Sequence, residues 1–123
     1  MSQPSGLANP KRGEIWDITF DPSVGGEIQK TRPAIVIGID SVGRLPLRIV
    51  IPITDWKSEY GQFPWMVALV PMSTNGLSKP SAADAFQVKS VSLLRFQKHL
   101  GVLLPAKVDD LAAAVALCVG YTP

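Results

Sequence analysis

The sequence predicts a mainly β protein, a small barrel or sandwich, with one helix at its C-terminal end. Pro, Gly and Ser interrupt the chain at roughly 8- to 12-residue intervals, and the runs between them are rich in Ile, Val and aromatic residues. With 123 residues, 46% of them hydrophobic, the chain can bury one core of its own but not two. We therefore expect a single domain at residues 11–123, preceded by a flexible N-terminal arm at residues 1–10, where Pro and Ser are frequent.

Three strands are expected in the first half of the chain. Residues 14–20 alternate apolar and polar side chains, which is typical of a half-buried strand. Residues 33–39 are almost wholly apolar and predict a central strand that is buried on both faces. Residues 47–54 form a third β-rich run. Pro52 within this run has no amide hydrogen for a ladder, so a bulge or a sheet edge is expected beside it.

The second half of the chain predicts shorter strands and the helix. Strands are expected at residues 65–70, 85–91 and 100–104, with loops at residues 55–64 and 73–82. Pro105 suits the first turn of a helix, and Gly120 suits its C-terminal stop. Between them apolar residues recur at helical spacing, so this helix is expected to pack on the barrel: Val108, Leu111, Ala112, Val115 and Val119.

Several function classes are excluded by what the sequence lacks. A single cysteine, Cys118, and a single histidine, His99, build neither an intramolecular disulfide nor a Cys/His zinc site. The phosphate loop of nucleotide hydrolases and the GxSxG and HExxH elements are absent. No signal peptide is recognisable, and the apolar stretch at residues 111–119 is far shorter than the roughly 20 residues that span a bilayer. We expect a cytoplasmic protein, with His99 as an ordinary surface or core residue.

The most informative stretch runs from Gly25 to Pro33 and leads directly into the apolar strand. Glu27, Lys30 and Arg32 lie in a turn at the entrance to a rigid strand, from which functional side chains are often presented. Pro33 favours an extended backbone at Arg32 and so restrains its guanidinium. Such a group suits phosphate, because it is planar, always charged and donates two parallel hydrogen bonds. Without further context, an arginine here is more often a solvated surface residue.

Several spaced blocks of the sequence resemble the MazF/PemK family of toxin endoribonucleases. The blocks are KRGEIW at residues 11–16, FDP at 20–22, GGE at 25–27, KTRPAIVI at 30–37, IVIPIT at 49–54 and QVKSV at 87–91. The resemblance extends over residues 11–121. It implies an SH3-like barrel of the CcdB/MazF type that forms a homodimer and cleaves single-stranded RNA at short sequence motifs. It further implies that cleavage needs no metal or other cofactor and that a cognate antitoxin protein silences the toxin.

The resemblance also assigns the catalytic residues. The arginine of the family's Arg-Pro element falls on Arg32, the threonine that ends its third strand falls on Thr54, and the acidic residue of its Gly-Gly-Glu turn falls on Glu27. Cleavage by the 2′-hydroxyl needs charge stabilised on the phosphate oxygens, for which a guanidinium and a hydroxyl are suitable donors. An arginine is a poor general base at neutral pH, so Glu27 is the conventional hypothesis for that role.

Contacts to RNA are expected from cations along the backbone and from rings on which bases stack. A net charge of only +2 predicts a local basic patch and not a wholly basic surface. Trp16 and Trp65 lie inside strand-like runs and are expected in the core. The predicted RNA contacts are Lys30, Thr31, Trp56, Lys57, Tyr60, Lys79 and Lys89.

Two other functions remain open from the sequence. Toxins that poison gyrase, of the CcdB type, resemble this barrel but inhibit by contact, and a non-cleaving RNA-binding barrel is a third reading. Cleavage of RNA in chelator, leaving a 2′,3′-cyclic phosphate, separates the endoribonuclease from both. The antitoxin is expected to fold an amphipathic segment into an apolar groove, between two barrels or beside the C-terminal helix.

Overall fold

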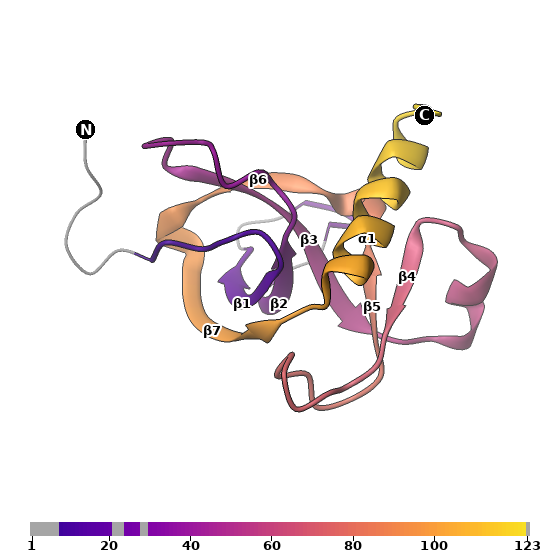
Figure 1. Cartoon of the computed structure of the whole chain (residues 1–123). Coiled ribbons are helices and arrows are strands. Elements are labelled where there is room, and N and C mark those ends of the chain that lie inside the picture. The colour runs from indigo at the N-terminus through magenta and orange to yellow at the C-terminus, as the bar shows by residue number, and fades with distance from the viewer. Residues whose placement is uncertain (1–7, 21–23, 28–29, 123) are drawn as a thin grey trace.

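A computed structural model describes residues 8–20, 24–27 and 30–122 (Figure 1). The described chain contains seven strands, three short 3-10 helices and one α-helix. In chain order these are β1 (Glu14–Thr19), β2 (Thr31–Val36), β3 (Leu47–Asp55), η1 (Ser58–Gln62), β4 (Met66–Leu69), β5 (Ser81–Asp84), η2 (Ala85–Gln87), β6 (Lys89–Ser92), η3 (Leu93–Arg95), β7 (Phe96–Val102) and α1 (Pro105–Cys118).

The strands form one coiled antiparallel sheet with the order β4-β5-β3-β2-β1-β7. The long strand β3 lies at its centre, and β6 pairs with the first half of β3 while β5 pairs with its last residues. Two register shifts between β1 and β7 increase the local twist and help the sheet to curl, as Figure 1 shows. The prediction of a mainly β fold with a C-terminal helix is confirmed. In the described chain, the strands β4 and β7 are the two edges of the sheet and do not pair with each other, so the barrel is not fully closed.

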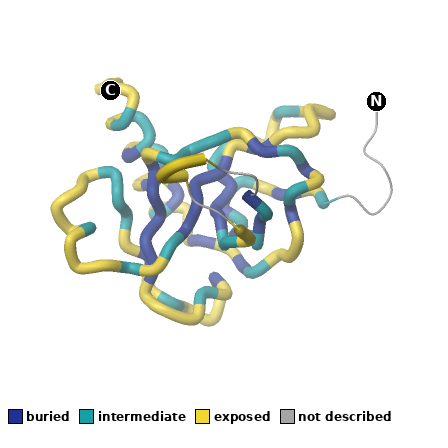
Figure 2. The backbone as a smooth tube through the Cα atoms, turned by 180° about the vertical axis from the view of Figure 1, so that it is seen from behind, coloured by how far each residue is buried: buried dark blue, intermediate teal, exposed yellow. Residues whose placement is uncertain are grey.

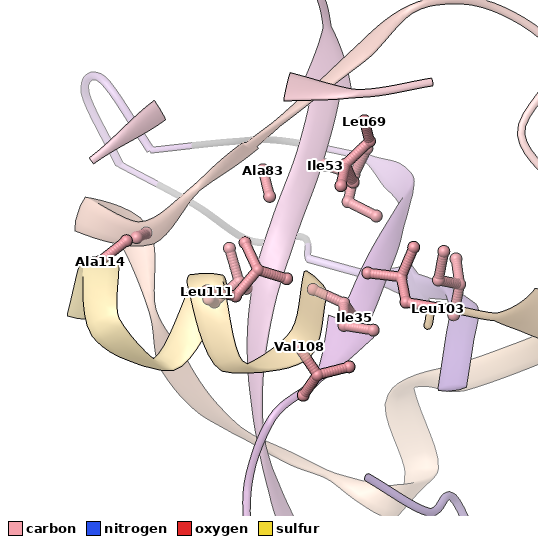
Figure 3. Close-up of a cluster of buried hydrophobic side chains, with 11 residues drawn as sticks. Ile35, Ile53, Leu69, Ala83, Leu103, Val108, Leu111 and Ala114 are labelled. Atoms are coloured by element: carbon pink, nitrogen blue, oxygen red, sulfur yellow. The ribbon is translucent and has the colours of Figure 1, made fainter. Parts of the chain in front are cut away.

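Two hydrophobic cores lie on opposite faces of β1, β2 and β3. Because successive side chains of a strand point to opposite faces, each of these strands contributes to both cores. Figure 2 shows the buried residues concentrated in these central strands. The helix-side core, drawn in Figure 3, consists of Ile15, Ile35, Ile51, Ile53, Leu69, Ala83, Ala85, Leu103, Val108, Leu111 and Ala114. The barrel core consists of Ile18, Phe20, Ala34, Val36, Val50, Val91, Leu93 and Phe96.

The helix α1 packs on one side of the sheet, as the sequence predicts, but Val119 of the predicted face lies beyond the helix and is 73% exposed. It begins at Pro105, and three of its side chains, Val108, Leu111 and Ala114, are buried against the strands. Figure 3 shows these side chains directed toward Ile35 and other strand residues. The spacing of the three buried positions is that of one helix face. Within the described residues, no helix has the length and apolar character that crossing a membrane would require.

The structure corrects two predictions about the central strands. The strand expected at residues 33–39 begins earlier, at Thr31, and ends at Val36, and the side chain of Ile39 is 64% exposed. The chain therefore leaves the sheet before the apolar run ends. Pro52 lies in the middle of β3, without the expected sheet edge or bulge in its pairing with β2. It falls between the segment of β3 that pairs with β6 and the segment that pairs with β5, where its missing amide hydrogen breaks neither ladder.

The prediction of a single strand at residues 85–91 is wrong. The structure has β5 before this region, beginning at Ser81 near the end of the predicted loop at 73–82, then η2, and β6 only from Lys89. The break has a local cause in the buried Asp84, whose side chain accepts a hydrogen bond from the Phe86 amide (3.1 Å) and another from the Gln87 side chain (3.0 Å). These bonds stabilise a turn and compete with a continued strand. The last strand is also longer than predicted, since β7 begins at Phe96.

The N-terminal arm expected at residues 1–10 lies mostly outside the described residues. Its last residues contact the barrel through Arg48 of β3, which is 7% exposed. The guanidinium of Arg48 donates hydrogen bonds to the Pro10 carbonyl (3.1 Å) and to the side-chain oxygen of Asn9 (3.2 Å). The ordered contacts of the domain therefore begin ahead of Lys11.

Candidate functional site

Arg32 of β2 and Thr54 of β3 lie just beyond the paired part of these neighbouring strands. In the pairing of β2 with β3, Ala34 lies opposite Pro52 and Ile35 opposite Ile51. If this register continued for two more residues, Arg32 would lie opposite Thr54. Residues that differ by two along a strand point to the same face, so Arg32 and Ala34 share a face of the sheet, as do Thr54 and Pro52. Both residues, Arg32 and Thr54, are half-buried.

The neighbouring strands define the surroundings of this pair. Arg32 lies opposite Ile18 of β1, and Thr54 lies opposite Ala82 of β5. Among the hydrogen bonds and ion pairs of the described residues, none uses the Arg32 guanidinium or the Thr54 hydroxyl. Both groups therefore keep their donors for a ligand.

The entrance to β2 is fixed by contacts with the end of β1. Lys30 has a left-handed backbone (φ 67°), and its carbonyl accepts a hydrogen bond from the Phe20 amide (2.9 Å). The hydroxyls of Thr31 and Thr19 lie 3.2 Å apart across the same strand pair. These contacts position the backbone immediately before Arg32. Of the predicted RNA contacts, Lys30 and Thr31 are thus exposed neighbours of the arginine.

Glu27 contacts β6 and its own turn in the described structure. One of its carboxylate oxygens lies 3.7 Å from the Lys89 ammonium of β6, and the other accepts a hydrogen bond from the Val24 amide (3.1 Å). No described contact joins Glu27 to Arg32 or Thr54. The structure therefore pairs two predicted site residues, Glu27 and Lys89, with each other.

Four predicted RNA contacts gather where β3 ends, directly after Thr54. The rings of Trp56 and Tyr60 meet edge to face with their centroids 5.9 Å apart. Lys57 is exposed at the start of η1. Lys79 comes from the loop before β5, and its ammonium lies 3.1 Å from the carboxylate of Asp55, the residue after Thr54. Two rings and two cations therefore lie at the end of β3 that carries Thr54.

Lys89 lies in a second place, beside a polar cavity that sequence reasoning did not identify. Its ammonium is 5.6 Å from the centre of the Phe20 ring. Arg95, which the sequence analysis did not single out, reaches the same place from η3 and donates a hydrogen bond to the Thr19 carbonyl (3.0 Å). Arg95 and Thr19 are 76 residues apart in the chain, so no local pattern could have indicated this contact.

Cys118 and His99 are the remaining side chains with reactive groups of interest. Burial raises the pKa of the Cys118 thiol, and the nearby carboxylate of Asp84 raises it further. The thiol therefore stays protonated at neutral pH and is a poor nucleophile. His99, expected as an ordinary surface or core residue, is exposed, and its ring nitrogen lies 3.5 Å from the carboxylate of Glu14. Among the residues that the structure describes, no group of three His, Cys, Asp or Glu side chains is arranged to hold a metal ion.

The two tryptophans expected in the core do pack against it. Trp16 is half-buried beside the barrel core and meets Phe96 edge to face, with centroids 5.7 Å apart. Trp65 packs on the helix-side core and stacks on Phe63 with centroids 5.1 Å apart. Neither tryptophan is the strand partner of Arg32 or of Thr54.

Comparison with known proteins gives consistent results for sequence and fold. A family model described as PemK-like, MazF-like toxin of type II toxin-antitoxin system matches residues 11–119. The endoribonuclease MazF9 of Mycobacterium tuberculosis is 30% identical over 113 residues, which cover 87% of this chain and 93% of that protein.

Solved structures with lower sequence identity share the fold. MazF from Deinococcus radiodurans has a TM-score of 0.77 at 22% identity, covering 92% of this chain and 98% of that chain. A mycobacterial endoribonuclease in complex with its cognate antitoxin has a TM-score of 0.71 at 17% identity, covering 93% and 98%. The fold that positions Arg32 and Thr54 is thus the fold of MazF. Since the family match extends over almost the whole domain, the chain belongs to the PemK-like, MazF-like toxins of type II toxin–antitoxin systems.

Proposed function

We propose that the chain is a metal-independent, sequence-selective endoribonuclease that cleaves single-stranded RNA, mRNA in particular. The observation that supports the proposal is the β2–β3 register, which, continued by two residues, would bring Arg32 opposite Thr54, two side chains that make no hydrogen bond or ion pair among the described residues. The rings and lysines at the end of β3 supply a surface on which bases stack and the RNA backbone binds. The endoribonuclease names of the sequence relatives favour this function over poisoning of gyrase.

The proposed reaction uses the RNA's own 2′-hydroxyl. The 2′-oxygen attacks the adjacent phosphorus, its proton passes to a base, and the bond to the 5′-oxygen breaks as that oxygen takes up a proton. The products are a 2′,3′-cyclic phosphate and a 5′-hydroxyl. Arg32 stabilises the negative charge that develops on the non-bridging oxygens, and the Thr54 hydroxyl donates to the same oxygens. Preorganised donors of this kind are typically worth about 3 kcal/mol of barrier each.

A cleavage assay in chelator tests this function. Purified protein is incubated with a long mixed-sequence RNA in excess EDTA, and the fragment ends are mapped. Discrete cuts that end in a cyclic phosphate are expected, and their positions define the recognition motif. RNA that stays intact at every salt concentration would overturn the proposal, and inhibition of gyrase would then be measured.

The role of Glu27 as the general base leads to a prediction about pH. A general base must be unprotonated to accept the 2′-proton, so the wild-type rate is expected to fall toward acidic pH. Glu27→Gln is expected to lower the rate by about 10²- to 10⁴-fold and to abolish this fall. The measurement is the single-turnover rate across pH. Glu59→Gln, in the exposed η1, is the matched control and should leave the profile unchanged. An acidic limb that persists in Glu27→Gln removes Glu27 from the role.

The assembly that we propose is a homodimer with a cognate antitoxin as its partner. A structural relative was solved with its cognate antitoxin, which supports a partner of the same kind here. Beside the start of α1 lies an apolar cavity of about 200 Å³, in the general position expected for an amphipathic antitoxin segment. Among its lining residues are Leu69, Val70, Met72, Val102, Leu103 and Leu104.

A further inference from the structure

A polar cavity of about 150 Å³ lies between the end of β1 and the segment formed by β6 and η3. It belongs to the open end of the barrel core, since Phe20 and Val91 contribute to both. The lining combines two cations, two serines and one aromatic ring: Phe20, Lys89, Ser90, Val91, Ser92 and Arg95. Among the described residues no acidic side chain lines the cavity, although Glu27 lies against Lys89.

The two cations are restrained at the cavity. Arg95 is tied to the end of β1 by its hydrogen bond to the Thr19 carbonyl, which fixes the plane of the guanidinium. Lys89 extends over the Phe20 ring, and its side chain is only 35% exposed. A restrained cation binds an anion with less loss of side-chain entropy than a freely moving one. The cavity is therefore preorganised for negative charge.

Ser92 adds a hydroxyl beside the cavity. Its oxygen already accepts a hydrogen bond from the Leu94 amide (3.1 Å), which leaves its own proton to donate to a ligand. Ser90 alternates with Lys89 and Val91, so its side chain is directed to the opposite face of β6. A guanidinium and an ammonium beside one small cavity match the acceptors of a phosphate group.

We infer that this cavity is a subsite for a second, non-scissile phosphate of the single-stranded RNA, an assignment that rests on the proposed function. Lys89 lies opposite Val50 on β3, four residues before Thr54 and on the same face of the sheet. At about 3.3 Å per residue the two positions are about 13 Å apart along the strand. In this proposal the phosphate at the cavity and the phosphate beside Thr54 are different phosphates of one strand, so the subsite fixes the register of the RNA.

The ion pair of Lys89 with Glu27 connects the subsite to the proposed base. A phosphate that enters the cavity competes with the Glu27 carboxylate for the Lys89 ammonium. Occupation of the subsite therefore releases Glu27 from β6, and removal of the carboxylate is expected to strengthen binding of RNA. Variants of Arg95 and of Glu27 should thus change RNA affinity in opposite directions.

The test measures RNA binding separately from cleavage. The probe is a mixed-sequence single-stranded RNA with 2′-O-methyl riboses, which cannot attack its own phosphates, and its binding is followed by fluorescence anisotropy across salt concentrations. Arg95→Gln is expected to raise Kd about tenfold and to reduce the slope of log K against log salt by roughly 0.7, the value for one lost phosphate contact on a single strand. Glu27→Gln is expected to lower Kd.

Two further variants keep the result interpretable. Lys89→Gln removes a cation that makes no backbone hydrogen bond in the described structure, so it tests the subsite even where Arg95→Gln weakens folding. Lys107→Gln, on α1, removes the same charge far from the cavity and is expected to leave the slope unchanged. An unaltered slope in both subsite variants, or an equal change in Lys107→Gln, would overturn the subsite. Failure of the wild type to cleave unmodified RNA overturns the proposed function instead, because the binding experiment does not depend on cleavage.

Discussion

Replacing Arg32 with alanine is expected to slow RNA cleavage by roughly 10²- to 10³-fold while leaving the fold intact. The rate falls because the guanidinium is the main positive charge next to the scissile phosphate, and loss of one preorganised donor typically costs about 3–4 kcal/mol of barrier. The fold is retained because the half-buried side chain has no hydrogen bond or ion pair among the residues that the structure describes. The rate is measured under single-turnover conditions in EDTA, with thermal unfolding measured in parallel.

Two comparisons test whether geometry or charge alone is responsible. Arg44→Ala removes the same charge from the exposed loop between β2 and β3, and its rate is expected to match the wild type. Arg32→Lys keeps the charge but loses the planar, two-donor geometry, so it should recover only part of the rate. Equal rates for the wild type and Arg32→Ala would remove Arg32 from the catalytic role that the resemblance implies.

The predictable parts of the fold are those in which one buried face makes apolar residues recur at a regular spacing. Residues 14–20 and the C-terminal helix each bury one face, and their apolar residues repeat accordingly. The region from Ser81 to Ser92 lacked such a signal. Its strands have only four residues each, and the turn between them depends on the buried side chain of Asp84, which a hydrophobicity pattern does not register.

The candidate site likewise contains residues that could be predicted and residues that could not. Arg32 and Thr54 were predictable because each belongs to a short recognisable block, and the strand register, continued by two residues, would bring them opposite each other. The ion pair between Glu27 and Lys89 and the position of Arg95 were not predictable. They depend on where η3 and β6 lie relative to the end of β1, which is a long-range property of the folded chain.

Substitution of Leu111 by alanine is expected to lower the free energy of unfolding by about 2–5 kcal/mol. Leu111 is fully buried in the helix-side core, where its side chain contacts the strands that carry the site on their other face. Ile35 and Ile53 of that core are close in sequence to Arg32 and Thr54. A cavity next to Ile35 and Ile53 weakens the packing of β2 and β3, the strands that carry Arg32 and Thr54.

Urea unfolding followed by tryptophan fluorescence measures this loss. For a domain of this size the midpoint should fall by about 1 M urea or more. Leu117→Ala is the matched control, because it deletes the same atoms from the same helix at a position that is 50% exposed. It should cost less than about 1 kcal/mol. Comparable losses at the two positions would contradict the orientation of α1. A large loss at Leu111 alone, with cleavage falling only as the folded fraction falls, would show that the helix supports the site through stability and takes no part in the chemistry.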